Sequence, residues 1–471
     1  MPHRAKIAGV NADSPVVVIG GGIAGLATAY ELHVRRVPFT LLEASERMGG
    51  VVFSEDVDGF IVDGGPDALL IQKPHGITLC EELGLGARLV ATKPPRLAYI
   101  QRGGQLHALP AGSVLGIPTE WAPFIKTSLF SWRGKLRMGA EMFVPRRTDT
   151  ADESIGAFMR RRFGDEATTY LAEPLLAGIH AGDVDRLSIR ALFPRFPDTE
   201  ARAGSLLRAF RSQPKPPSSR DGAFKSLPGG LSEMVRALET ALPAASLRLQ
   251  TPAVKVERIG DGYCVRTAVD ESVLGRAVVV ATPAYATALL LKDTAPDVAR
   301  ACGEIPYASA VTVALAFRRD SVEHPLNGSG FVVPRVEGTG IMAGSWLSSK
   351  WPNRAPEGFV LLRAFLGGAR DPEAIALADQ EIVTTAMRAL RPLLGIHGEP
   401  LFTRVYRWER ANAQHEVGHL DRVAAIDRAL ASCPGLFITG SGFRGVGIPD
   451  CVADGRTTAR QVSTWLDSSD L

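Results

Sequence analysis

A glycine-rich turn that joins an apolar strand to a helix constrains the fold of this chain more than any other feature. The apolar run Val16–Ile19 leads into a GxGxxG pattern formed by Gly20, Gly22 and Gly25. The first glycine permits a tight turn, the second lets the backbone approach a pyrophosphate, and the third lets the helix pack closely on the strand. The helix N-terminus offers free N–H groups to that pyrophosphate. The pattern predicts a dinucleotide-binding β-α-β unit that extends to about residue 80.

The residues that follow indicate which dinucleotide binds. A second apolar strand ends in Glu43, 18 positions after Gly25, where a carboxylate can bind ribose hydroxyls and disfavours the 2′-phosphate of NADP. Arg47 and the glycine pair 49–50 come next. An arginine for phosphate, beside glycines that permit close approach, favours FAD over NAD. The segment Gly64–Asp67 follows a further apolar strand and would bring backbone near an isoalloxazine ring.

The C-terminal part of the chain has the same order of strand, glycine turn and helix. The strand Leu436–Thr439 leads into the glycine turn 440–447, and a helix is predicted from about Asp450 to Leu466, with Pro449 in its first turn. Backbone N–H groups at this turn suit the ribityl or pyrimidine end of a flavin. Because matching units lie at both ends of the chain, we expect one discontinuous nucleotide-binding domain with other domains inserted in it.

The middle of the chain divides into a helical part and β-rich parts. Residues 111–210 are predicted to be mostly helical. Within them, the capping box Thr150–Glu153 predicts an amphipathic helix that continues to Phe163. The other predicted elements are short strands in 246–282, 311–317 and 330–365 and a helix near 374–394.

Composition excludes several classes of function. A net charge of +3 at pH 7 over 471 residues gives no case for nucleic-acid binding, which needs clustered basic residues. The five cysteines are widely spaced with no CxxC pair, which argues against a disulfide framework and fits a reducing cytoplasm. We expect no signal peptide, because the N-terminal residues lack an apolar core. No stretch reaches the roughly 18 apolar residues of a spanning helix.

One segment, 111–145, mixes aromatic and basic side chains, such as Trp132 beside Arg133 and Lys135. This mixture fits peripheral contact with a membrane surface. A helical core with a basic outer face is the preferred interpretation.

A second pattern, HExxH, is formed by His415 and His419 and is typical of zinc proteases. Gly418 within that turn is unfavourable for a helix, and no third ligand is evident. We therefore expect no metal.

Over nearly its full length, from Val16 to about Leu466, the chain resembles the flavin porphyrinogen oxidases. Besides the general flavin signature, the segments particular to that family are Gly65–Asp67, Leu115–Thr119, Ala122–Phe124, Glu173–Leu176, Gly178–Asp183, Lys350–Pro352, Ala355–Gly358, Val417–Leu420 and Gly445–Cys451. The resemblance is greatest to the bacterial branch that oxidises coproporphyrinogen III to coproporphyrin III. A neighbouring branch oxidises protoporphyrinogen IX.

The resemblance implies an α/β fold with a Rossmann-like FAD-binding domain of the amine oxidase and porphyrinogen oxidase type. A β-rich substrate domain and a helical domain are inserted in it, and the substrate is held between the domains over the flavin. The expected boundaries are 13–80, 222–302 and 403–471 for the FAD-binding domain, 81–110 and 303–402 for the substrate domain, and 111–221 for the helical domain.

The family's site residues transfer to matching positions of this sequence. The implied FAD contacts are Gly20, Gly21, Gly22, Ile23, Ala24, Gly25, Leu26, Glu43, Ala44, Arg47, Gly50, Val51, Gly65, Pro66, Asp67, Ala68, Val254, Trp408, Val446, Gly447 and Ile448. The implied substrate contacts are Lys73, which is suited to a propionate, and Gly178, which lies beside the tetrapyrrole.

Two positions depart from the family pattern. Residues 413–415 read Ala-Gln-His where the family has proline, glutamine and tyrosine, so no role is assigned to them. Ala98 stands roughly where many protoporphyrinogen enzymes carry an arginine for a propionate. Arg96 or Arg102 is the alternative cation. The missing arginine weakens the protoporphyrinogen interpretation.

The reaction that the resemblance implies is oxidation of coproporphyrinogen III by FAD and oxygen in haem synthesis. Hydride passes from a meso carbon to the flavin, and no general base is assigned. The product is expected to pass to a chelatase. Protoporphyrinogen IX is the alternative substrate. More distant alternatives are a flavin amine oxidase, in which Trp408 and Phe443 would cage the amine, a carotenoid desaturase, and a non-catalytic tetrapyrrole- or flavin-binding carrier.

Overall fold

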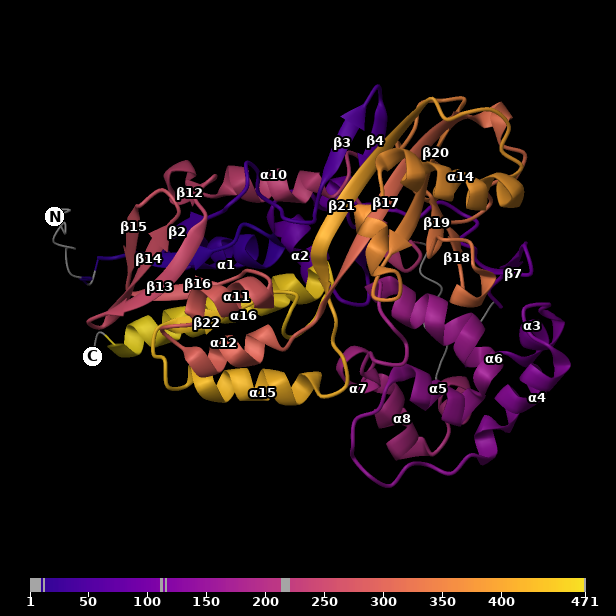
Figure 1. Cartoon of the computed structure of the whole chain (residues 1–471), viewed down its shortest axis with the longest axis horizontal. Coiled ribbons are helices and arrows are strands. Elements are labelled where there is room, and N and C mark those ends of the chain that lie inside the picture. Colours follow the sequence, from indigo (N-terminus) through magenta and orange to yellow (C-terminus); the bar gives the residue numbers. More distant parts are fainter. Residues whose placement is uncertain (1–9, 12, 111–112, 115–116, 213–220, 470–471) are drawn as a thin grey trace.

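The computed structural model describes residues 10–11, 13–110, 113–114, 117–212 and 221–469. A five-stranded parallel sheet forms one half of the molecule (Figure 1). Its strands, in spatial order, are β12 (Leu247–Arg248), β2 (Phe39–Leu42), β1 (Val16–Ile19), β16 (Ala277–Val280) and β22 (Leu436–Ile438). The sheet therefore combines strands from the beginning, the middle and the end of the chain, as expected for a discontinuous domain.

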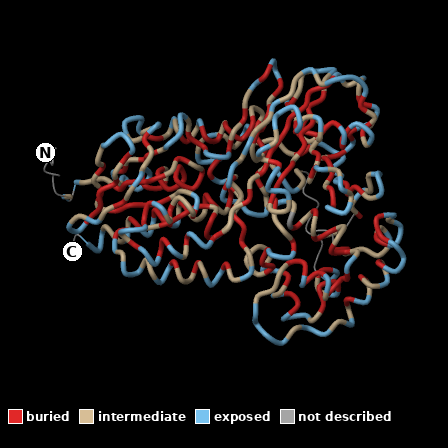
Figure 2. The backbone as a smooth tube through the Cα atoms, viewed as in Figure 1, coloured by how far each residue is buried: buried red, intermediate tan, exposed pale blue. Residues whose placement is uncertain are grey.

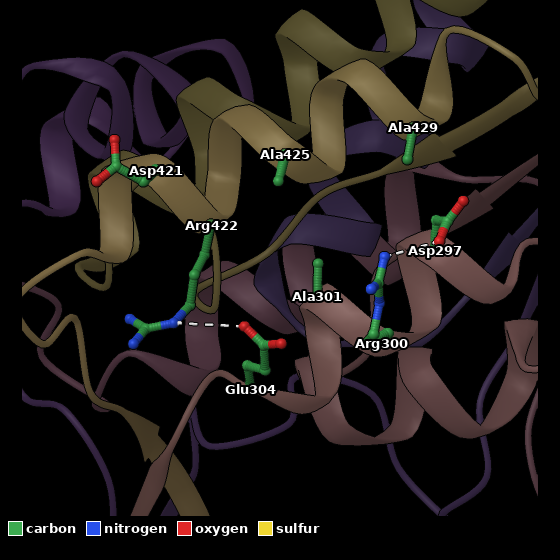
Figure 3. A pocket seen from close by; sticks show the side chains of 8 residues that line it. All are labelled: Asp297, Arg300, Ala301, Glu304, Asp421, Arg422, Ala425 and Ala429. Atoms are coloured by element: carbon green, nitrogen blue, oxygen red, sulfur yellow. Dashed lines mark hydrogen bonds and ion pairs between the residues drawn. The ribbon is translucent and has the colours of Figure 1, made fainter.

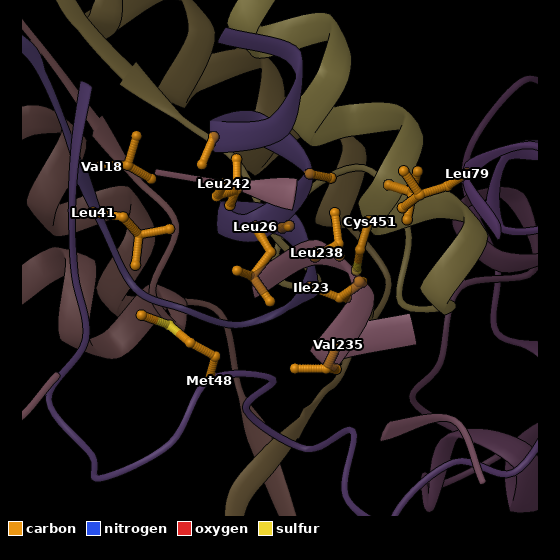
Figure 4. Close-up of a cluster of buried hydrophobic side chains, with 14 of the residues drawn as sticks. Val18, Ile23, Leu26, Leu41, Met48, Leu79, Val235, Leu238, Leu242 and Cys451 are labelled. Carbon is orange, nitrogen blue, oxygen red and sulfur yellow. The ribbon is translucent and has the colours of Figure 1, made fainter. Parts of the chain in front are cut away.

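Helices cover both faces of this sheet because its strands are apolar on both sides. Successive side chains of β1 point in opposite directions, so Val16 and Val18 enter one buried cluster and Val17 and Ile19 enter another. Figure 4 shows the first cluster, where Leu26, Leu238 and Cys451 come from three different helices. The helices on that face are α1 (Ile23–Val34), α2 (His75–Glu82), α10 (Ser232–Ala241) and α16 (Ile448–Ser469).

The opposite face carries three helices and a small antiparallel sheet. Its elements are α11 (Ala284–Leu291), α12 (Pro296–Gly303), α15 (His419–Leu430), β13 (Ala253–Ile259), β14 (Gly262–Thr267) and β15 (Ser272–Gly275). Figure 2 shows the resulting band of buried backbone through the sheet, with exposed helices outside it. The strands predicted in 246–282 are confirmed as β12 to β16.

A second, seven-stranded sheet forms the upper part of the other half of the molecule (Figure 1). Its strands, in spatial order, are β21 (Phe402–Ala413), β17 (Tyr307–Arg318), β20 (Phe359–Gly367), β19 (Ala343–Trp346), β18 (Gly330–Val332), β7 (Ala98–Arg102) and β8 (Gln105–Ala108). Helix α14 (Asp379–Leu394) packs on it. Strand β21 belongs to this sheet, although the expected boundary at residue 403 assigns most of it to the FAD-binding domain. The domain boundaries stay a prediction.

Short elements connect the two sheets. They are β3 (Ser54–Val57), β4 (Phe60–Asp63), β5 (Leu69–Leu70), β6 (Val90–Ala91), β11 (Phe224–Ser226) and α13 (Leu347–Lys350). Residues of β4, β17, β20 and α13 share one buried cluster with Trp351, so the connection is apolar as well as hydrogen-bonded.

The helical part lies below the second sheet and has its own apolar core (Figure 1). Its elements are β9 (Ser113–Val114), β10 (Ile117–Pro118), α3 (Trp121–Lys126), α4 (Trp132–Gly139), α5 (Ile155–Phe163), α6 (Asp165–Ala167), a π-helix (Thr168–Ala177), a 3-10 turn (Gly178–His180), α7 (Ile189–Leu192), α8 (Arg195–Ala203) and α9 (Leu206–Ser212). Leu115 and Gly116, from one of the family-like segments, lie outside the described residues.

The predicted amphipathic helix is α5, but its predicted cap is wrong. The Oγ of Ser154 accepts a hydrogen bond from the backbone N–H of Ala157 at 3.1 Å, so Ser154 is the N-cap and the helix begins at Ile155. The residues from Thr150 to Glu153 precede the cap. A serine nearer the apolar run satisfies the first turn, and the acid at Glu153 bonds Arg161 instead.

The aromatic and basic segment divides between core and surface. Phe124 and Phe130 are buried, whereas the side chains of Trp132, Leu136 and Phe143 are mostly exposed. Among the described helices, none has an apolar run long enough to cross a bilayer. The pattern combines a helical core with an outer face that is both apolar and basic.

Candidate cofactor and substrate site

The glycine turn between β1 and α1 has the geometry that its sequence predicts. Gly20 has a φ of +109°, and a Cβ there would lie 2.8 Å from the carbonyl oxygen of Ala281. A Cβ on Gly25 would collide with the carbonyl oxygen of Gly20, so α1 packs tightly on the turn. A Cβ on Gly22 would meet nothing within 4 Å. Gly22 therefore faces open space at the N-terminus of α1, where a pyrophosphate can approach the backbone.

The carboxylate of Glu43 is fixed at the end of β2. Its Oε2 accepts a hydrogen bond from the N–H of Gly21 at 2.6 Å, and its Oε1 accepts from the N–H and hydroxyl of Ser45 at 2.8 and 2.7 Å. The N–H of Thr251 donates to the Glu43 carbonyl at 2.8 Å, which brings the start of β13 alongside. The predicted ribose acid thus stands next to the glycine turn.

The predicted phosphate arginine is turned toward its own loop. The Arg47 guanidinium donates to the Gly50 carbonyl at 2.7 Å and lies 4.7 Å from the centre of the Phe53 ring. These contacts close the loop that carries Gly50 and Val51. A contact between Arg47 and phosphate stays a prediction. Two apolar side chains at predicted FAD positions, Val51 and Val254, are 40% and 52% exposed, which suits packing against a ring system.

The backbone at Gly64 and Gly65 is held between the two sheets. Trp408 on β21 and Thr312 on β17 both donate to the Gly64 carbonyl, from Nε1 at 2.9 Å and from Oγ1 at 2.7 Å. A Cβ on Gly65 would collide with the carbonyl oxygen of Val51. Trp408 is therefore next to the predicted flavin-binding backbone, as the resemblance implies, and it fixes that backbone through its indole N–H.

The carboxylate of Asp67 is engaged within the protein. It accepts from Lys350 Nζ at 2.7 Å, Trp351 Nε1 at 2.7 Å and Arg363 at 2.9 Å. Although burial opposes ionisation, Lys350 and Arg363 hold the pKa of Asp67 well below its usual range. Because the carboxylate is engaged in this way, we expect Asp67 to contact the cofactor only through its backbone. The side chains of Ile23, Ala24 and Leu26 also point into the core, so their predicted contacts are backbone contacts as well.

The turn before α16 carries the last of the predicted cofactor contacts. Val446 and Gly447 are half-buried and Ile448 begins the helix. The Oγ1 of Thr28 on α1 donates to the Gly455 carbonyl at 3.1 Å, and a Cβ on Gly455 would press on the Ala24 carbonyl. Helices α1 and α16 therefore pack closely, and a single cofactor site at their N-terminal turns stays a prediction.

The two histidines of the HExxH pattern support this turn. Their rings stack with centroids 3.7 Å apart. His415 Nε2 lies 3.1 Å from the Ser441 carbonyl oxygen, and His419 Nε2 lies 2.8 Å from that of Phe443. His419 begins α15 and His415 precedes it, so the two are not on one helical face. Among the described residues, no group of three or more His, Cys, Asp or Glu side chains could hold a metal ion.

Acidification is expected to destabilise the protein through His415. Burial and then His419 lower the pKa of His415 to about 3 from an ordinary 6.5. The unfolded chain binds a proton that the folded chain excludes, so this contribution is complete above pH 6.5 and is lost as the pH falls toward 3. Between pH 6.5 and 5 the free energy of unfolding should fall by about 2 kcal/mol.

Urea unfolding at pH 7 and pH 5 measures this loss. His415→Gln should remove that part of the pH dependence, whereas His33→Gln, at an exposed histidine, should leave it unchanged. An unaltered pH dependence in the His415 variant would contradict the assignment.

On the substrate side, Lys73 is paired with the first turn of α16. Its Nζ lies 2.8 and 2.7 Å from the two carboxylate oxygens of Asp450. The side chain of Lys73 is 50% exposed and that of Asp450 is 22% exposed, so the pair is open to solvent. Asp450 lies two residues after Ile448, a predicted flavin contact. Its ion pair with Lys73 therefore brings the predicted propionate-binding cation close to the predicted cofactor contacts. The sequence placed Asp450 in a family-like segment but did not predict that it pairs with Lys73.

The segment that follows the π-helix borders a cavity. Gly178 lines a cavity of about 310 Å³ together with Ala181 and Gly182. The rest of the lining comes from Glu173, Pro174, residues 333–335, residues 338–342, Gly367 and residues 369–371. Ile179, next to Gly178 in the chain, is 67% exposed. An exposed isoleucine next to a residue that lines a cavity suits an apolar macrocycle. It lies in the family-like segment Gly178–Asp183, although no role was assigned to it from the sequence.

Three residues were considered from the sequence as alternatives: Arg96 and Arg102 as the propionate-binding cation, and Phe443 as a wall of an amine cage. Arg102 forms an ion pair with Glu166 at 2.6 Å and stacks over Tyr170 in the helical part. Arg96 Nε donates to Thr92 at 3.0 Å. Phe443 is 2% exposed in the core and does not face Trp408 as the second wall of an amine cage.

A second hollow, of about 350 Å³, lies between α12 and α15 on the opposite side of the first sheet (Figure 3). Its floor is Ala301, Ala425 and Ala429, and its rim includes the pair Arg422 and Glu304, 3.9 Å apart. None of the residues that line it is a predicted site residue.

Comparisons with known proteins agree with this geometry. The family described as flavin containing amine oxidoreductase matches residues 23–463. The coproporphyrinogen III oxidase of Bacillus subtilis (strain 168) is 37% identical over 467 residues, which cover 96% of this chain and 98% of that protein. The chloroplastic protoporphyrinogen oxidase of Nicotiana tabacum is 28% identical over 497 residues, covering 99% of this chain and 88% of that protein.

A solved structure from Exiguobacterium sp. 255-15, provisionally named as a protoporphyrinogen oxidase, has a TM-score of 0.85 at 32% identity and covers 96% of this chain and 99% of that one. The family resemblance and the fold class inferred from the sequence are thus confirmed. The glycine turn, the fixed ribose acid and the open space at Gly22 fit the cofactor that this family uses. The chain belongs to the flavin-containing amine oxidoreductase family, and it is an FAD-dependent oxidoreductase.

Proposed function

We propose that this chain oxidises coproporphyrinogen III to coproporphyrin III with FAD and oxygen. The observation that supports the proposal most directly is the solvent-open pair of Lys73 and Asp450, because a cation at the first turn of α16 could exchange its partner for a substrate carboxylate. The cavity beside Gly178, lined by both apolar and charged residues, offers room for a substrate. The names of several relatives that match over nearly the full chain support the same substrate.

The residues of this chain bind and orient both partners in the reaction. The N-termini of α1 and α16, together with Glu43, would hold the dinucleotide, and Trp408 fixes the backbone at Gly64 against it. Lys73 would anchor a propionate, and Gly178 and Ile179 would contact the macrocycle. The bound flavin supplies a hydride acceptor. The protein positions the substrate against the flavin and excludes water from between them.

The remaining parts of the proposal concern partners and location. Each round removes a hydride from a meso carbon and one proton from the macrocycle, and oxygen is the final acceptor. All five cysteines are unpaired, which supports a reducing cytoplasm. Transfer of the product to a chelatase is part of the same proposal. Peripheral contact with a membrane would use the exposed Trp132, Leu136 and Phe143.

Protoporphyrinogen IX is the second candidate substrate. The provisional name of the Exiguobacterium structure favours it. Arg102 is paired with Glu166, which makes it less available to a propionate.

Porphyrin fluorescence tests both substrates. Purified holoenzyme with oxygen should form coproporphyrin faster than protoporphyrin when the two porphyrinogens are supplied separately. Lys73→Ala should raise KM about tenfold with little change in kcat, because a charge-assisted contact made before and during the reaction affects binding. Lys292→Ala, at an exposed lysine after α11, is the matched control.

Three outcomes would alter the proposal. Faster protoporphyrin formation would move the assignment to the second substrate. An unchanged KM in the Lys73 variant would remove that residue from the site. A yellow protein that accelerates neither reaction would contradict tetrapyrrole oxidation and leave the flavoprotein assignment intact.

A further inference from the structure

We propose that Arg363 stabilises the negative charge that the flavin ring gains on reduction, and so raises the midpoint potential of the bound cofactor. The inference concerns the cofactor and not the substrate. It rests on the predicted contact between the backbone at Gly65 and the flavin, and it holds whichever compound this chain oxidises.

Arg363 is a buried cation bound directly to the backbone that is predicted to meet the flavin. Its side chain is 2% exposed. Its Nη1 donates to the carbonyls of Asp63 and Gly65 at 2.6 and 2.7 Å, and its Nη2 donates to Asp67 Oδ1 at 2.9 Å. The positive charge therefore lies within hydrogen-bond distance of a residue assigned to the cofactor site.

The second sheet explains why this arginine points toward that backbone. Arg363 on β20 pairs with Ala314 on β17. Two residues earlier on β17, Thr312 donates to the Gly64 carbonyl at 2.7 Å. Side chains two residues apart on a strand share a face, and directly paired residues share it across strands. The face that carries Thr312 therefore also directs Arg363 toward the segment 63–67.

The buried charges around this segment do not cancel. Two carboxylates, Asp63 and Asp67, form ion pairs with three cations, Lys350, Arg354 and Arg363. All five side chains are at most 14% exposed. When every group is ionised, the cluster has an excess of one positive charge. Burial raises the pKa of Asp63, and a proton on that carboxylate would enlarge the excess.

Hydrogen bonds within the protein do not satisfy the whole guanidinium of Arg363. Its Nε is buried and has no hydrogen-bond partner in the part of the chain that the structure describes. The centre of the Phe365 ring lies 4.7 Å from its Cζ. Because the surroundings are apolar and water is excluded, the charge acts more strongly on its neighbours than it would at the surface. A buried cation of this kind is suited to stabilise an anion that forms nearby.

Reduction of the flavin creates such an anion. A C–H bond of the substrate breaks, its hydrogen passes with two electrons as hydride to the oxidised ring, and the new N–H bond leaves the ring with one negative charge. The substrate, left with a positive charge, loses one proton to solvent. Oxygen then takes the two electrons with two protons to become hydrogen peroxide, and the negative charge on the ring is lost. Because only the reduced ring is charged in this way, a neighbouring cation favours reduction.

The midpoint potential of the bound flavin, measured by absorbance against a redox dye without any porphyrinogen, tests the proposal. Arg363→Met should lower it by about 30 mV or more, which for a two-electron couple is a tenfold loss of affinity for reduced relative to oxidised flavin. Arg363→Lys keeps the charge and should retain most of the wild-type potential. Arg318→Met, at a pair whose side chains are 63% and 67% exposed, is the matched control and should leave the potential unchanged.

Two further variants test the effect of charge even if Arg363→Met does not fold. Lys350→Met removes a cation whose Nζ lies 2.7 Å from Asp67 Oδ2, so it should lower the potential. Asp67→Asn removes a carboxylate from the same contact and should raise it. A purely structural role for these side chains predicts no such reversal of sign.

A change of less than about 9 mV in Arg363→Met, which is a twofold effect, would overturn the role of this cation. Shifts of the same sign in the Lys350 and Asp67 variants would overturn it as well. Both results leave the proposed function intact. A wild-type flavin that neither porphyrinogen reduces would overturn the proposed function without changing the measured potentials on which this inference depends.

Discussion

Replacing Gly22 with valine is expected to give a folded protein that binds FAD at least about tenfold more weakly, a loss of about 1.4 kcal/mol or more. A side chain at this position meets no protein atom within 4 Å of its Cβ, so the fold accommodates it. The same side chain would occupy the space through which a pyrophosphate reaches the N-terminus of α1. Flavin absorbance of the purified protein and titration of the apoprotein with FAD measure the effect.

Two further glycines make the experiment specific. Gly25→Ala should lower the melting temperature of the flavin-free protein, because its Cβ collides with the Gly20 carbonyl and the backbone must move. Gly303→Ala should change neither property, since its Cβ would lie 3.8 Å from the nearest atom, on Ala288. Wild-type flavin content in the Gly22 variant would contradict the placement of the pyrophosphate.

Replacing Arg354 with methionine is expected to lower the free energy of unfolding by about 3–5 kcal/mol, because it leaves a buried carboxylate without its cation. The side chains of Arg354 and Asp63 are both 0% exposed, and Arg354 Nε lies 3.0 Å from Asp63 Oδ2. The guanidinium also donates to the carbonyls of Leu227 and Pro228 at 3.0 and 2.7 Å. Burial raises the pKa of Asp63 even with Arg354 present, so the acid is costly to leave alone.

Chemical denaturation of the flavin-loaded protein measures this loss. Arg318→Met is the matched control, because Arg318 and Asp320 form a pair whose side chains are 63% and 67% exposed, and such pairs contribute about 1 kcal/mol or less. The double variant Asp63→Leu with Arg354→Met should recover part of the stability. Equal losses at Arg354 and Arg318 would contradict the account.

The sequence by itself determined the features that depend on local backbone geometry. The positive φ of Gly20 and the close approach at Gly25 belong to one short segment that joins β1 to α1, and the alternation of Val16 to Ile19 between two cores follows from strand geometry. Glu43 is fixed next to this turn by the same β-α-β unit. The choice between two nearby N-caps could not be made from the sequence. A capping box beginning at Thr150 was predicted, but Ser154, four residues later, caps α5.

Only the tertiary structure decided which distant groups meet. Strand propensity does not specify a partner, so the pairing of β21 with β17 in the second sheet could not be inferred from either run alone. Asp67 is predicted from the family resemblance to be a flavin contact, yet its carboxylate forms ion pairs with Lys350 and Arg363. Lys73 likewise meets Asp450 from the other end of the chain. Charges act through space, so their partners and pKa values depend on how the chain folds rather than on spacing along it.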